Sequence, residues 1–187
     1  MILVSSLNGF LKKIPEPLRR AIRGTVLPVD ICEVHIEQIE TTYNRLVKWI
    51  KLHSEAMLML TFSSNPLTSL TSKLYSSLIR SFANPIGLHV HIRDDLNSPP
   101  LPLPSYTIQH NTIKNGLETL KKLGVQTIDF TSGHWSYNID TFAVCKKLRL
   151  KNVHIKLKEI PKITLAHGIP KGIRLIPVIH HIHDYET

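Results

Sequence analysis

The order of apolar segments along the chain is the feature that most restricts its fold. Short apolar runs of strand length alternate with longer segments in which apolar residues recur at helical spacing. The strand-sized runs are 25–30, 56–62, 85–92, 125–130, 152–157 and 173–182. The helical segments between them are 36–50, 67–82, 112–123 and 139–148. This alternation predicts an α/β domain with mostly parallel strands, either an open sheet or a barrel.

The chain is long enough for one domain preceded by a short segment. It has 187 residues, of which 42% are hydrophobic, so it can bury a substantial core. Residues 1–24 read as an amphipathic helical segment broken near Pro15 and Pro17, and residues 25–187 as the α/β domain. The basic side of the first segment is predicted to be exposed and consists of Lys12, Lys13, Arg19, Arg20 and Arg23. This segment either covers one end of the sheet or binds a membrane surface or partner.

The net charge of +9 favours anionic partners, either an anionic polymer or, as an alternative function, nucleic acid. No run of five or more Lys and Arg residues is present, and a basic surface that binds nothing acidic is the simpler interpretation.

Several features bear on where the protein acts. No apolar run reaches the roughly 18–20 residues of a membrane span, and residues 1–24 do not have the pattern of a secretory signal. Two cysteines do not suggest a disulfide framework. We therefore expect a cytoplasmic protein.

Three residues near strand ends form a candidate metal site. His89 and His91 are two residues apart in a predicted strand, so their side chains point to the same side. Two neutral imidazoles suit zinc, and cobalt or nickel would also be accepted. Asp30 ends the first strand and could be a metal ligand, a general base or a helix N-cap. Two exposed histidines on an edge strand would give the same pattern.

Two further segments carry candidate substrate and proton-transfer residues. Thr131, His134 and Trp135 follow the fourth strand, where an aromatic ring beside polar groups could bind a sugar or simply pack at a helix start. Near the end of the chain, His181 and His183 lie on one face of an extended segment. Either could act as a general acid near neutral pH, unless the segment is a solvated tail.

Taken in order, these segments resemble the NodB-type polysaccharide deacetylase superfamily. The resemblance rests on four short stretches of the chain. They are Pro28-Val29-Asp30, Ile86-Gly87-Leu88-His89-Val90-His91, residues 130–138 beginning Phe130-Thr131-Ser132-Gly133-His134-Trp135, and the end of the chain through His183-Asp184-Tyr185-Glu186. The resemblance implies a distorted (β/α) barrel and metal-dependent removal of an N-acyl group from a carbohydrate. The YdjC-type carbohydrate deacetylases, which use similar Asp and His ligands, are a closely related alternative.

The resemblance also assigns roles. It implies Asp30, His89 and His91 as metal ligands, His183 or else His181 as the acid, and Glu33 as the base. Three positions depart from the family pattern: Val29 replaces an acid, Arg93 the usual second histidine, and Thr131 the loop arginine. These departures keep open a non-catalytic protein that binds carbohydrate or another ligand on the same fold. A phosphoesterase or amidohydrolase is a further alternative, although those enzymes usually carry the His-x-His pair on the first strand.

Overall fold

The computed structural model describes residues 28–31, 47–48, 51–52, 57–62, 69–92, 102–156, 160 and 171–178. Its strands are β1 (Pro28–Ile31), β2 (Met57–Phe62), β3 (Ile86–Val90), β4 (Asp129–Ser132), β5 (Asn152–Lys156) and β6 (Arg174–Val178). Its labelled helices are α5 (Ser69–Ser81), α6 (Tyr106–Lys122) and α7 (Ile139–Lys147), with a short 3-10 helix η1 (Gly133–Trp135) before α7.

The six strands form one sheet in the order β1-β2-β3-β4-β5-β6, and every neighbouring pair is parallel. The chain therefore adds each new strand beside the previous one and never reverses direction across the sheet. Crossovers between parallel strands are almost always right-handed, so this order places the connecting helices on one face. The predicted α/β class and the predominance of parallel strands are confirmed.

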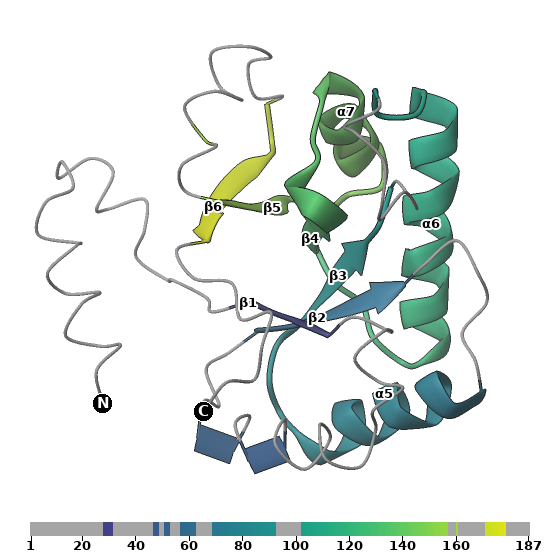
Figure 1. The fold of residues 1–187 in the computed structure, drawn as a ribbon, viewed down its shortest axis with the longest axis vertical. Helices are drawn as coiled ribbons and strands as arrows, with labels where there is room; N and C mark the ends of the chain where they lie inside the picture. Colours follow the sequence, from purple (N-terminus) through teal and green to yellow (C-terminus); the bar gives the residue numbers. More distant parts are fainter. Residues whose placement is uncertain are drawn as a thin grey trace, which may run out of the picture.

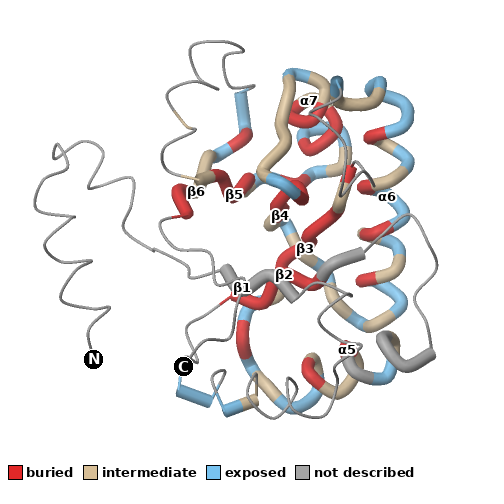
Figure 2. Tube along the Cα trace, in the orientation of Figure 1, coloured by how far each residue is buried: buried red, intermediate tan, exposed pale blue. Residues whose placement is uncertain are grey.

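One face of the sheet is apolar and is covered by the helices. Figure 1 shows α5, α6 and α7 arranged around the same outer side of the sheet. Figure 2 marks buried residues in red, and these lie along the central strands and on the sides of the helices that face them. From the sheet, the hydrophobic core includes Leu58, Leu60, Leu88, Val90, Phe130, Val153 and Ile155. From the helices it includes Tyr75, Leu78, Ile113, Leu120, Phe142 and Val144.

Several predicted boundaries are wrong, and local chemistry explains two of them. Helix α6 begins at Tyr106 and not near residue 112, because Pro104 and Ser105 lead directly into its first turn and the Gln109 N–H donates to the Ser105 carbonyl at 3.0 Å. Strand β4 begins at Asp129 and not at 125, because Gly124 adopts φ +85° after the helix and residues 125–128 are needed to reach the sheet.

The remaining predictions agree to within a few residues or fall on undescribed positions. Strand β5 is described as far as Lys156 and β6 as far as Val178, so the predicted ends at 157 and 182 lie outside the described residues. The predicted segment 1–24 and most of helix 36–50 lie outside the described residues. Among the described helices, none is long and apolar enough to cross a membrane.

A buried polar network fixes α7 against α6. Asn138 caps α7 by accepting from the Thr141 N–H at 3.0 Å, and the Thr141 hydroxyl accepts from the Asn138 N–H at 3.1 Å. Gln109, which is fully buried, accepts from the Thr141 hydroxyl at 2.7 Å and donates to the Pro104 carbonyl at 2.7 Å. One side chain of α6 thereby fixes the start of both helices.

We predict that Gln109→Leu destabilises the fold by about 1–3 kcal/mol, because the Thr141 hydroxyl and the Pro104 carbonyl each lose a hydrogen bond to a buried side chain. Urea denaturation measures this as a lower midpoint with an unchanged slope. The matched control is Gln126→Leu at an exposed position, which should change stability little. Equal stability of the two variants would contradict the role given to Gln109.

Candidate functional site

The second face of the sheet carries a concentration of polar side chains. Because side chains alternate along a strand, the residues between the core positions point away from the helices. We call this the histidine face. Its described members on the central strands are Met57, Met59, Gly87, His89, Asp129, Thr131, Asn152 and His154. None of these residues belongs to the apolar core between sheet and helices.

Three histidines gather at the carboxyl end of β3 and the loop after β4. The His89 and His91 rings are stacked with centroids 4.9 Å apart and planes 19° from parallel. The His134 ring meets His91 edge-on, also at 4.9 Å. Exposure rises across the group, since His89 is buried, His91 is half-buried and His134 is exposed. The three imidazole rings therefore extend from the solvent-exposed His134 inward to the buried His89.

The loop after β4 is shaped to fit the His91 ring. A Cβ on Gly133 would lie 2.6 Å from His91 Cγ and 2.9 Å from its Cα, so a larger residue would collide with both ring and backbone. The next two residues, His134 and Trp135, both have φ of 53°, in the left-handed region that side chains disfavour. Strain of this kind is concentrated at functional sites.

Trp135 directly follows His134 in the 3-10 helix η1. The Lys156 ammonium nitrogen lies 5.2 Å from the centre of the Trp135 ring, within the range of a cation–π interaction. An aromatic surface beside a cation and imidazoles suits a hydroxylated or anionic ligand better than an apolar one. Thr131 lies beside His89 in the β3–β4 register and is buried.

A tyrosine hydroxyl separates β4 from β5 at this end of the sheet. The regular parallel ladder would have the Ser132 N–H donate to the His154 carbonyl. Instead the Ser132 N–H donates to the Tyr137 hydroxyl at 3.1 Å, and that hydroxyl donates to the His154 carbonyl. The two strands are thus held apart where their carboxyl ends open, which is where parallel sheets bind ligands.

The predicted site residues are only partly described. The structure brings His89, His91, Thr131, His134 and Trp135 together at one edge. The backbone of Asp30 pairs with Met59 near the end of β1, two strands from β3, and nothing further is described of its side chain. Glu33, His181 and His183 lie outside the described residues.

The described histidine group is short of a full metal site. Among the described residues, no group of three or more His, Cys, Asp or Glu side chains converges on a point that could hold a metal ion. His89 and His91 supply at most two ligands, so a third would have to come from a residue such as Asp30.

The sequence analysis missed a second polar group on the same face. Asp129 and His154 form a contact of 2.9 Å, and Asn152 donates to the same carboxylate oxygen at 2.9 Å. The signal was present in the segment 152–156, where polar residues alternate with Val153 and Ile155. That alternation places Asn152 and His154 on the face opposite the core.

Two other features lie away from this face. Cys145 is buried in the core, and burial raises the pKa of its thiol, so it remains protonated and is a poor nucleophile.

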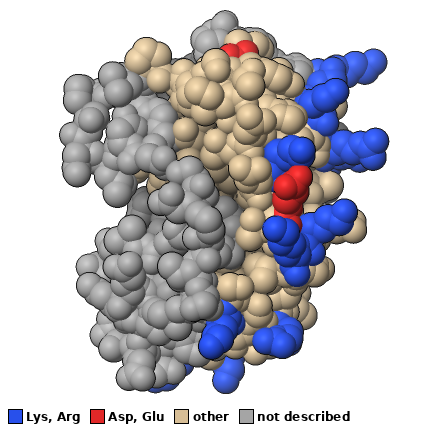
Figure 3. Space-filling view, turned by 90° about the vertical axis from the view of Figure 1, so that its right-hand side faces the viewer, with Lys and Arg blue, Asp and Glu red and all other residues tan. Residues whose placement is uncertain are grey.

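Figure 3 shows Lys and Arg side chains gathered along one side of the molecule, with few acidic residues among them. On the helices and the turn after α7, the exposed members include Lys114, Lys121, Lys122, Lys146, Lys147 and Arg149. This positive charge lies on the helical side of the sheet, apart from the histidine face.

No protein-family model and no curated protein matches this chain.

We predict that Gly133→Ala displaces the His91 ring, because the added methyl group has no room beside it. Long-range ¹H–¹⁵N spectra of the imidazoles should show altered His91 resonances with the overall fold retained. Gly124→Ala is the control: it has positive φ but open space around it, so it should cost stability without moving His91. Unchanged His91 resonances in Gly133→Ala would show that the loop does not position the ring.

Proposed function

We propose that this chain is a metal-dependent hydrolase that removes an N-acyl group from a carbohydrate, on a fold of the (β/α) barrel type. The observation that carries the proposal is the joint position of His89 and His91 at the carboxyl edge of a parallel sheet, with Gly133 fitted against His91. Active sites of (β/α) barrels are built at this edge. The sequential strand order with helices on one face is the arrangement that closes into such barrels.

The donor chemistry of the histidine pair fits a divalent metal. Two imidazoles on the same side of a strand end are ligands that zinc, cobalt and nickel accept. Asp30 would complete the set, since β1 ends at the same edge as β3. Such a metal, when bound, polarises an acyl carbonyl and lowers the pKa of water.

The remaining roles belong to side chains of this chain. Trp135 would present its ring to a sugar, and His134 and Thr131 would donate or accept hydrogen bonds around it. His183, with His181 as the alternative, would give a proton to the departing nitrogen, and Glu33 is the sequence-based choice of base. A carbohydrate is favoured because an aromatic ring beside polar side chains matches the apolar and hydroxylated sides of a sugar ring.

The test is release of acetate from N-acetylglucosamine oligomers by the full chain supplied with zinc, cobalt or nickel. We expect release by the unaltered protein, and loss of both release and bound metal in the double variant His89→Ala, His91→Ala. His110→Ala, on helix α6 and away from the histidine face, should behave like the unaltered protein. Folded protein that holds metal but releases no acetate would overturn the deacetylase and favour a protein that only binds its ligand.

The acid can be tested separately. We predict that His183→Ala lowers the rate by about 10²–10⁴-fold and leaves metal content unchanged, because only proton transfer is lost. His180→Ala is the matched control, since alternation places His180 on the opposite side of an extended segment. Loss of metal in His183→Ala would make it a ligand and not the acid.

A further inference from the structure

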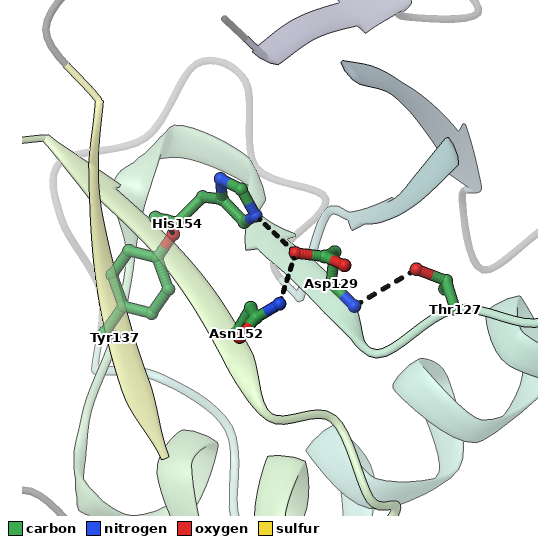
Figure 4. Close-up of polar contacts among 5 residues, drawn as sticks. All are labelled: Thr127, Asp129, Tyr137, Asn152 and His154. Atoms are coloured by element: carbon green, nitrogen blue, oxygen red, sulfur yellow. Dashed lines mark hydrogen bonds and ion pairs between the residues drawn. The ribbon is translucent and has the colours of Figure 1, made fainter. Parts of the chain in front are cut away.

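A buried Asp–His pair lies on the histidine face, where β4 and β5 run side by side (Figure 4). His154 Nε2 and Asp129 Oδ1 are 2.9 Å apart, the His154 side chain is fully buried and that of Asp129 is 14% exposed. The Asn152 amide donates to the same oxygen at 2.9 Å, and the Asp129 N–H donates to the Thr127 hydroxyl at 3.0 Å. Backbone and carboxylate of Asp129 are therefore both held in place.

The carboxylate decides which ring nitrogen of His154 carries the proton. An ionised aspartate only accepts hydrogen bonds, so a neutral His154 donates through Nε2 and keeps its lone pair on Nδ1. Figure 4 shows Nδ1 on the side of the ring away from Asp129. Within the described part of the chain, His154 Nδ1 and the neighbouring Thr131 hydroxyl are buried without a hydrogen-bond partner. Buried polar atoms of this kind call for a ligand or water.

The free nitrogen belongs to the same face as His89 and His91. His89 pairs with Thr131 across β3 and β4, and Val153, the residue before His154, pairs with Phe130 across β4 and β5. His89 and His154 thus lie on the same face two strands apart, with about 10 Å or more between their backbones.

We propose that His154, in place of Glu33, is the general base of the hydrolysis and that Asp129 is its positioning residue. This inference rests on the proposed function. His154 Nδ1 takes a proton from water, the water oxygen bonds to the acyl carbon, and the carbon–nitrogen bond breaks as the nitrogen receives a proton from the acid. One water is thus added across the carbon–nitrogen bond, which gives a carboxylic acid and an amine. Proton exchange with solvent then returns His154 and the general acid to their starting protonation states.

The other charged or titratable groups on this face are accounted for. His89 lies on β3 and His91 directly after it, and both are committed to the metal. Lys156 on β5 lies over Trp135, and Arg174 on β6 pairs in register with Asn152 and is exposed. On this face, the carboxylate of Asp129 holds the imidazole of His154.

The experiment uses the full chain loaded with zinc and follows both rate and ring protonation. We expect His154→Gln to lower acetate release by about 10²–10⁴-fold, with metal content kept and the acidic limb of the pH–rate profile lost. Asp129→Asn keeps the His154 imidazole but removes the carboxylate that holds its proton on Nε2. We therefore expect a lower rate, and ¹⁵N spectra in which more of the ring proton is on Nδ1. His110→Gln is the control and should match the unaltered protein.

The outcomes separate this inference from the proposed function. Full activity with an unchanged pH profile in His154→Gln overturns the base and leaves the hydrolase standing. An Nδ1–H tautomer of His154 in the unaltered protein overturns the base as well. Absence of acyl hydrolysis by the unaltered, metal-loaded protein overturns the proposed function and the base together. If His154→Gln does not fold, the rate and tautomer of Asp129→Asn decide.

Discussion

Leu88 and Phe130 face the helices, while the residues directly beside them in sequence, His89 and Thr131, face the other way. The packing of helices on one side of the parallel sheet is the interaction on which the rest of the structure depends. Once the core positions of β3, β4 and β5 are buried under α6 and α7, the residues next to them in sequence must point to the opposite face of the sheet. A slip of one residue would bury the histidines under helices and expose the core, so the same packing fixes both fold and site.

The site is then refined by a few local devices. Gly133 lets the loop after β4 approach the His91 ring, and the left-handed backbone of His134 and Trp135 turns that loop back over the sheet edge. The Tyr137 hydroxyl bridges Ser132 and His154, so β4 and β5 separate without leaving either backbone group unpaired. The Asp129 carboxylate orients His154. The Gly133 loop and the Tyr137 bridge act at the end of β4, whereas Asp129 acts from the first residue of that strand.

The sequence predicts the strand–helix order, the parallel sheet and the joint position of His89, His91 and the residues 131–135, because periodicity is a local property of the chain. It does not predict that His134 would meet His91, which depends on the backbone conformation after Gly133. It also misses the pair of Asp129 and His154, because those residues are far apart in sequence and meet only through the register of β4 and β5. The early start of α6 depends on the buried Gln109, whose partners are Pro104 and, about 30 residues further along the chain, Asn138 and Thr141.

We propose that one face of the sheet carries both a metal-binding histidine pair and a histidine held by a carboxylate. A paramagnetic NMR spectrum of the full chain titrated with cobalt(II) tests both parts together. We expect one ion per chain, hyperfine-shifted imidazole protons from His89 and His91, strong broadening of the His154 ring and little effect on His110. Binding that leaves the His89 and His91 signals unshifted, or that broadens His110 more than His154, would contradict it.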